Sequence, residues 1–141
     1  MPKIITLETI GRDDSGYLSF FESDNDIPFE IKRIYYIYDV PLGLQRGMHA
    51  HKELEQLIWC PYGNVEIILD NGIESRSYIL DRPNKGLVVN KGFWRDMYWR
   101  KESSVLCVAA SDYYTEDDYI RNYDEFKRYV EKGYWGNENQ F

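Results

Sequence analysis

Short runs of β-branched and aromatic residues alternate with turn signals along most of the chain. β-Branched and aromatic side chains favour extended strands, whereas Gly, Pro, Asn and Asp favour turns. We therefore expect strands over residues 31–40, 55–60, 65–69, 74–80, 86–89, 97–99 and 105–110. Seven or more short strands separated by tight turns are typical of an all-β domain built as a small antiparallel barrel or sandwich.

Four turn signals separate the apolar runs: Asp13-Asp14-Ser15-Gly16, Pro61-Tyr62-Gly63-Asn64, Asp70-Asn71-Gly72 and Asp81-Arg82-Pro83-Asn84. The step from Asn71 to Gly72 is the clearest, because Asn-Gly readily takes the positive φ angles that a tight hairpin needs. We expect its two flanking strands to pair as antiparallel neighbours.

The apolar spacing changes near the C-terminus from that of a strand to that of a helix. Thr115 and the three acidic residues after it indicate a helix N-cap and an acidic first turn. Apolar residues then follow at helical spacing, at Tyr119, Tyr123, Phe126 and Val130. The pattern predicts a single domain over residues 1–141, with one helix over approximately 115–131 packed against the barrel.

Composition narrows the possible functions. The chain has 141 residues, 43% of them hydrophobic, and a formal net charge of -7, which argues against non-specific nucleic-acid binding. No apolar run is long enough to cross a membrane and the N-terminus shows no secretory signal, so we expect a soluble, cytoplasmic protein. Cys60 and Cys107 lie in separate strand-like runs and are expected to act as small hydrophobic residues.

The only two histidines, His49 and His51, are two residues apart. On a strand such residues share one face, with Cα atoms about 6.5–7 Å apart. Imidazole titrates near neutral pH, so a pair in one cavity can move protons. The alternative is that the two side chains cap a strand end or face solvent.

The histidine pair also fits the spacing of the first metal-binding motif of cupins, with its positions at Gly43, His49, His51 and Glu55. A cupin metal site needs a further histidine from a later strand, and the matching segment, 90–95, places Arg95 there. An arginine stays protonated and repels a divalent cation. We therefore expect chemistry without a metal, and the alternative is a metal-dependent cupin enzyme that uses His49, His51 and Glu55.

Arg33 and Tyr35 lie on the same face of the strand expected over 31–40. If this face points into the barrel, the guanidinium can hold an anionic oxygen of a ligand while the phenol donates a hydrogen bond to a sugar oxygen. If it points outward, both are ordinary solvated residues.

Five segments in this order resemble the sugar-nucleotide 3,4-ketoisomerase family, whose members are also described as WxcM-like cupins. The resemblance spans nearly the whole chain and is carried by residues 29–36, 46–51, 94–95, 109–114 and 118–124. It implies a cupin-type (RmlC-like) antiparallel β-barrel or jelly roll with a C-terminal helix. It also implies a homodimer whose N-terminal strands are exchanged between subunits.

The resemblance further implies an isomerase that converts dTDP-4-keto-6-deoxy-D-glucose to a 3-keto isomer through an enediol, with the galacto product favoured. No metal or organic cofactor is implied, and the product would supply 3-amino-3,6-dideoxy sugars for bacterial surface glycans, including lipopolysaccharide and S-layer glycans. A cupin that binds a nucleotide sugar without turning it over is the remaining alternative.

Carried onto this chain, the resemblance makes His49 the catalytic base, with His51 beside it and Tyr35 as an active-site hydroxyl. Arg33, Arg46 and Arg95 are expected to contact the substrate. The tail segment over 119–123 resembles the family equally well, and we expect it to pack the C-terminal helix rather than to recognise the thymine base.

Overall fold

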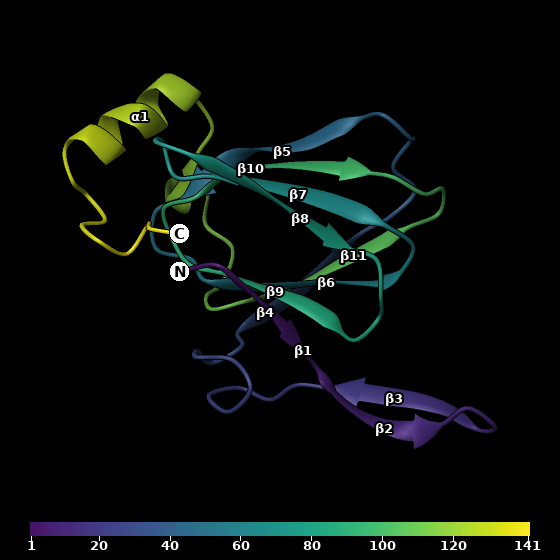
Figure 1. The fold of residues 1–141 in the computed structure, drawn as a ribbon. Helices are drawn as coiled ribbons and strands as arrows, with labels where there is room; N and C mark the ends of the chain where they lie inside the picture. Colours follow the sequence, from purple (N-terminus) through teal and green to yellow (C-terminus); the bar gives the residue numbers. More distant parts are fainter.

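The computed structural model describes all 141 residues. Two five-stranded sheets face each other and the helix covers one end of them (Figure 1). The elements are, in chain order, β1 (Lys3–Thr6), β2 (Glu8–Arg12), β3 (Gly16–Phe20), β4 (Arg33–Ile37), β5 (Gln45–His51), β6 (Gln56–Tyr62), β7 (Val65–Asp70), β8 (Ser75–Leu80), β9 (Lys85–Val89), β10 (Trp94–Trp99), β11 (Val105–Ala110), the 3-10 turn η1 (Glu116–Asp118), β12 (Tyr119–Ile120) and α1 (Tyr123–Glu131).

The strand order confirms the predicted all-β antiparallel fold. One sheet has the order β1-β9-β6-β11-β4 and the other β12-β5-β10-β7-β8, and every strand pair is antiparallel. All seven predicted strands are present, β11 with the predicted bounds and the other six with ends shifted by up to three residues. The expected hairpin joins β7 to β8, where Gly72 has a φ of +90°. Asn71 supports this turn by accepting hydrogen bonds from the backbone N–H groups of Ile73 and Glu74.

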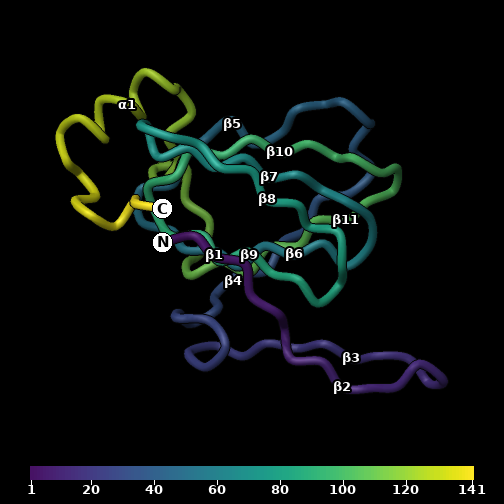
Figure 2. Tube along the Cα trace, in the orientation of Figure 1, coloured from purple at the N-terminus to yellow at the C-terminus, as the bar shows by residue number.

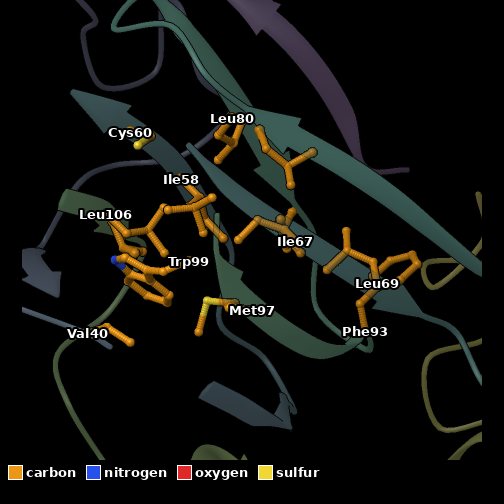
Figure 3. Packing of buried hydrophobic residues seen from close by; sticks show 14 residues of the cluster. Val40, Ile58, Cys60, Ile67, Leu69, Leu80, Phe93, Met97, Trp99 and Leu106 are labelled. Carbon is orange, nitrogen blue, oxygen red and sulfur yellow. The ribbon is translucent and has the colours of Figure 1, made fainter. Parts of the chain in front are cut away.

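The main core lies between the two sheets and follows from the alternation of side chains along the strands. On β7, for example, Val65, Ile67 and Leu69 are buried while the residues between them are partly exposed. Fourteen buried residues form this cluster, and Figure 3 shows Trp99, Leu106 and Ile58 meeting from different strands. Cys60 belongs to it, and both cysteines are free thiols.

The pattern of apolar runs did not predict the N-terminal hairpin made of β2 and β3, although the family resemblance implied N-terminal strands. The hairpin extends away from the two sheets and is drawn in purple (Figures 1 and 2). The turn signal over 13–16 joins its strands, as the composition of that segment indicated. Three of its large apolar side chains, Ile10, Tyr17 and Leu18, are each about 60% exposed, at 64, 63 and 59%.

The predicted helix over 115–131 was wrong in its first half. Thr115 precedes only the 3-10 turn η1, and its side chain makes no capping hydrogen bond. Residues 119 and 120 then form β12, which pairs with β5. The helix α1 begins only after Asn122, whose side chain accepts a hydrogen bond from the N–H of Glu125 at 2.9 Å. Pairing with β5 gives this segment backbone partners that an earlier helix start would not provide.

Helix α1 and the tail pack against the end of β5 and β10. A second cluster joins Phe126 and Trp135 to Ala50, Trp94 and Ile120. The indole N–H of Trp135 also donates to the backbone carbonyl of Lys52 at 2.8 Å. The tail therefore fixes the end of the strand that carries both histidines. Neither α1 nor any other helix in the structure is long and apolar enough to span a membrane.

Candidate active site

His49 and His51 project from the same face of β5, as the sequence predicted. Their ring centroids lie 4.9 Å apart with an interplanar angle of 82°. His51 is fully buried, whereas His49 is partly exposed. The ring of Tyr119, from β12, lies 5.0 Å from that of His49 and 4.5 Å from that of His51. The three rings thus form one compact group.

A β-bulge immediately before the histidines sets the direction of this strand. Gly47 and Met48 have φ angles of +87° and +55°. In the pairing with β10, His49 lies opposite Arg95 and Gly47 opposite Asp96, so Met48 is the extra residue. A Cβ atom on Gly47 would lie 2.7 Å from the carbonyl oxygen of Arg95. Glycine is therefore required here by both the backbone angle and the close approach of β10.

The hydrogen bonds of the two imidazoles define their tautomers. Nδ1 of His49 lies 3.0 Å from the carbonyl oxygen of Gly47, and Nδ1 of His51 lies 2.8 Å from Oδ2 of Asp118. Both partners only accept hydrogen bonds, so Nδ1 carries the proton in each ring and Nε2 carries the lone pair. Nε2 of His51 is buried and has no partner in the protein. Each histidine therefore offers Nε2 as a proton acceptor.

Both imidazoles are neutral at physiological pH. Burial and the nearby positive charge of Arg95 lower the pKa of His49 to about 3. Burial also lowers the pKa of His51 to about 4, although its hydrogen bond to Asp118 acts in the opposite direction. Burial raises the pKa of Asp118, but the hydrogen bonds from His51 and from the N–H of Glu53 outweigh it, so the pKa lies below its ordinary value.

A chain of buried polar side chains connects three strands beside the histidines. Arg95, on β10, donates a hydrogen bond to the side-chain oxygen of Gln56, on β6. The side-chain nitrogen of Gln56 in turn donates to the hydroxyl of Tyr35, on β4, at 2.9 Å. Gln56 and Arg95 are only 1% and 2% exposed. Burial keeps the pKa of Tyr35 above its ordinary value despite the positive charge of Arg95, so the phenol is protonated.

A cavity of about 260 Å³ brings the candidate residues together. His49, Tyr35 and Arg46 line it, joined by Tyr119 and Arg121 from the C-terminal segment. Arg121 lies 4.2 Å from the ring centroid of Tyr119 and is paired with Glu116. The cavity thus places a proton acceptor, a hydroxyl donor and two arginines around one space.

Two of the expected substrate contacts lie outside this cavity. Arg33 shares a face with Tyr35, as predicted, and the structure turns this face inward, but Arg33 lines a smaller adjoining cavity of about 100 Å³. Its guanidinium lies 5.1 Å from the ring centroid of Tyr35. Arg95 lies behind the cavity wall and bonds to Gln56 and to the carbonyl of Phe93. Of the three arginines, only Arg46 shares a cavity with His49.

Glu55, the third ligand of the alternative metal site, does not line the cavity of His49. Glu55 lines a separate cavity with Asn90, Lys91 and Glu138. The next residue, Gln56, is the one that faces the interior beside Tyr35. The spacing of the metal motif therefore occurs in the sequence, but the fold does not bring its three ligands to one place.

The sequence analysis missed four residues of the site: Gln56, Asp118, Tyr119 and Arg121. We expected the tail segment over 119–123 only to pack the helix, and Ile120 does so by joining the cluster that contains Phe126 of α1. Its neighbours Tyr119 and Arg121 instead line the cavity of His49. The family-like character of this segment was the available signal, whereas nothing in the sequence marked Gln56.

This chain is similar to known proteins over most of its length. The family model described as "FdtA: WxcM-like, C-terminal" matches residues 1–131. A TDP-4-oxo-6-deoxy-alpha-D-glucose-3,4-oxoisomerase of Aneurinibacillus thermoaerophilus is 45% identical over 130 residues, which cover 92% of this chain and 93% of the relative. The QdtA 3,4-ketoisomerase of Thermoanaerobacterium thermosaccharolyticum has been solved as a histidine-to-asparagine mutant in complex with TDP-4-keto-6-deoxyglucose. Its structure superposes on this one with a TM-score of 0.88 at 39% identity, covering 93% of this chain and 94% of that one.

Two solved relatives from Campylobacter jejuni are named for different sugars. The TDP-quinovose 3,4-ketoisomerase WlaRB is 45% identical with a TM-score of 0.85, covering 90% of this chain and 97% of that one. The TDP-fucose-3,4-ketoisomerase WlaRA is 35% identical with a TM-score of 0.82, covering 90% and 93%. A dTDP-4-dehydrorhamnose 3,5-epimerase (rfbC) of Bacillus anthracis shares the fold, with a TM-score of 0.73 at 19% identity over 84% of this chain and 76% of that one. This likeness confirms the RmlC-like fold class.

Proposed function

This chain belongs to the FdtA family of WxcM-like sugar 3,4-ketoisomerases, and on that premise we propose that it converts TDP-4-keto-6-deoxy-D-glucose to a TDP-3-keto-6-deoxy-hexose. The substrate is proposed from the relatives, one of which binds this nucleotide sugar in its solved structure. The single observation that carries the proposal is the state of His49. Its imidazole is neutral, lines the cavity and has Nε2 free to accept a proton, because Nδ1–H donates to Gly47.

Carbon proton transfer is assigned to Nε2 of His49. The proton on C3 is acidified by the neighbouring C4 ketone, so a neutral imidazole can remove it and leave an enediolate. Return of a proton to C4 then leaves the ketone at C3. One C–H bond breaks at C3 and one forms at C4, so the reaction is an internal redox that needs no hydride carrier.

A second proton must pass between the two oxygens, because O3 loses its proton and O4 gains one. We propose that His51 serves this step, because its Nε2 has no partner within the protein. The fully buried ring lies behind His49 and Tyr119, however, and does not line the cavity. The role of His51 in oxygen proton transfer therefore stays a proposal, and it requires the substrate to reach past Tyr119.

Negative charge on the enediolate oxygen needs a donor, and the Tyr35 hydroxyl lines the same cavity as His49. A donor that is already oriented at the developing charge typically accelerates such a step by about 10²–10³-fold. Arg46 also lines the cavity and makes no ion pair, so we assign it to a phosphate oxygen of the nucleotide. Arg33 and Arg95 are assigned no direct contact in this cavity.

The product can have the galacto or the gluco configuration at C4. The galacto product expected from the sequence stays a prediction. The relative named for TDP-quinovose, a sugar of gluco configuration, is 45% identical, and the one named for TDP-fucose, of galacto configuration, is 35% identical. This comparison favours the gluco product. The coupling between H4 and H5 decides between them when the product is formed in ordinary water, so that C4 carries a proton, and it is large for gluco and small for galacto.

We further propose that the chain forms a homodimer through exchange of its N-terminal hairpin. The hairpin extends from the barrel with Ile10 and Leu18 exposed, and β4, at the edge of its sheet, exposes Ile34 and Tyr36. Covering such apolar surface favours association. Light scattering should give twice the chain mass of 16.9 kDa. The double variant Ile10→Glu/Leu18→Glu should be monomeric, whereas a monomeric wild-type protein would contradict the proposal.

The metabolic setting is proposed from the resemblance alone. A 3-keto sugar is the form on which an amino group can be installed at C3, which fits supply of 3-amino-3,6-dideoxy sugars for surface glycans. Nucleotide sugars are made in the cytoplasm, and we propose that compartment.

The test is NMR of TDP-4-keto-6-deoxyglucose in deuterated buffer with metal-stripped wild-type protein and with His49→Asn and His51→Asn. Wild-type protein should give the 3-keto sugar with deuterium incorporation. His49→Asn should bind the substrate but abolish exchange at C3 and product formation. His51→Asn should retain exchange at C3 but lose product if His51 serves the oxygens. Saturable binding without turnover would favour the binding-only cupin, and turnover only after metal addition would favour the metal-dependent alternative.

A further inference from the structure

Gln56 is the middle member of the buried chain between Arg95 and Tyr35, and the proposed proton transfers do not use it. It is 1% exposed, and it bonds to β10 in one sheet and to β4 in the other. A buried amide that serves only packing could be replaced by an apolar residue. Both polar atoms of this amide are instead bonded to residues of the site.

The orientation of the Gln56 amide follows from the chemistry of its partners. A guanidinium only donates hydrogen bonds, so the amide oxygen must face Arg95. The amide nitrogen must then face Tyr35, and its N–H donates to the phenol oxygen at 2.9 Å. A flipped amide would place its NH2 group against the guanidinium. Arg95 therefore fixes which end of Gln56 meets Tyr35.

The same reasoning fixes the direction of the Tyr35 hydroxyl proton. Because the phenol oxygen accepts from Gln56, its own proton cannot point at the amide nitrogen and must be donated in another direction. Tyr35 lines the cavity with His49, so that direction is open to a ligand. Burial holds the pKa of Tyr35 above its ordinary value, which keeps this proton in place.

We propose that Gln56 is a positioning residue that makes the Tyr35 hydroxyl a hydrogen-bond donor toward the substrate oxygen on which charge develops. Arg95 acts one step further back by locking the amide. The inference rests on the proposed isomerase function and deepens it. It gives the arginine at position 95 a role inside the protein rather than at the substrate.

Gln56→Glu tests the proposal with almost no change in shape. One carboxylate oxygen can still accept from Arg95, but the other is an acceptor where the amide was a donor. The Tyr35 hydroxyl then donates to Glu and turns its proton away from the cavity. The expected result is a fall in kcat on the order of 10²-fold with KM little changed, the size of losing one oriented donor.

Combining Gln56→Glu with Tyr35→Phe distinguishes a positioning role of Gln56 from a merely structural one. In a Tyr35→Phe background there is no hydroxyl to orient, so Gln56→Glu should cause no further loss of kcat. Equal losses in both backgrounds, or wild-type kcat in Gln56→Glu, would overturn the proposal. Gln56→Met, which removes the donor and keeps the length, should show the same coupling and serves if the Glu variant does not fold.

Two outcomes distinguish this proposal from the function on which it rests. If wild-type protein does not isomerise the nucleotide sugar, the proposed function fails. If wild-type protein is active and Tyr35→Phe keeps full kcat, the function stands and the proposal for Gln56 is wrong, because no hydroxyl then needs positioning.

Discussion

His51 and Asp118, 67 residues apart in the chain, are joined by a hydrogen bond of 2.8 Å between Nδ1 and Oδ2. The other carboxylate oxygen of Asp118 accepts from the backbone N–H of Glu53 at 2.8 Å. The carboxylate is thus held at two points and fixes the imidazole tautomer. Nε2 of His51 is left as the proton acceptor.

Replacing Asp118 by Asn should therefore lower activity more than stability. The amide can present its NH2 group to Nδ1, which moves the ring proton to Nε2 and removes the acceptor. We expect kcat to fall by about 10²–10⁴-fold, the range for loss of positioned acid–base catalysis, measured with the NMR assay. Asp117→Asn is the matched control, because Asp117 lies in the same turn and is exposed. Equal effects of the two variants would contradict the role of Asp118.

The acid limb of the pH–rate profile should lie well below the ordinary titration of histidine. The proposed base His49 must be neutral, and burial together with Arg95 lowers its pKa to about 3. The value of kcat/KM should therefore stay constant as the pH falls from 7 to 5. A loss of half the activity near the ordinary value of 6.5 would show that His49 is not buried as described, or that another group is the base.

The same two pKa values predict acid destabilisation. The folded-state values of His49 and His51, about 3 and 4, lie below the unfolded value of about 6.5. The unfolded chain therefore binds more protons below pH 6.5, and stability is lost as the pH falls through this window. Each histidine should lower the free energy of unfolding by up to about 1.4 kcal/mol per pH unit.

Denaturant unfolding at pH 7, 6 and 5 measures this loss. The chain contains no other histidine, so the double variant His49→Gln/His51→Gln serves as the control. It should show a flatter dependence on pH over this range, and an unchanged slope would mean that other groups cause the loss.

Much of the fold follows from the chain pattern, because strands and turns are set by neighbouring residues. Alternation along β7 and the Asn71-Gly72 turn were sufficient to predict the β7–β8 hairpin. The N-terminal hairpin escaped prediction because every residue of β2 is exposed, so no buried face marks the strand. The start of α1 was misplaced because pairing of Tyr119 with His51 is a long-range contact that overrides the local capping signal at Thr115.

The candidate site likewise contains residues that the sequence predicts and residues that only the fold brings together. The spacing of His49 and His51 and that of Arg33 and Tyr35 each predict a shared face, since this is a property of one strand, but only the fold shows that the face of Arg33 and Tyr35 points inward. Asp118 and Gln56 act through partners on other elements, so no local spacing identifies them. Arg95 was recognised as a departure from the metal motif, but only the fold shows that it bonds to Gln56.

Gly47→Ala should disturb the site through the backbone of β5. The new Cβ would lie 2.7 Å from the carbonyl oxygen of Arg95, in a residue whose φ is +87°. A left-handed backbone alone costs a residue with a Cβ atom roughly 1–2 kcal/mol. We expect Gly47→Ala to lower the free energy of unfolding by more than this, and to lower kcat because His49 shifts. Gly43→Ala isolates the backbone cost, since Gly43 has a φ of +80° and an added Cβ there meets nothing. Similar melting temperatures for both variants would argue against a clash.

Translation delivers the parts of the site at different times. A ribosome that has reached Ala110 has already made every strand of the two sheets except β12, including the strand with both histidines. Asp118, Tyr119 and Arg121 have not yet been synthesised, so His51 has no partner at Nδ1 and the cavity lacks part of its wall. We therefore expect the site to be completed only after its last segment leaves the exit tunnel, and a chain that stops after β11 to lack the partner of His51 and part of the cavity wall.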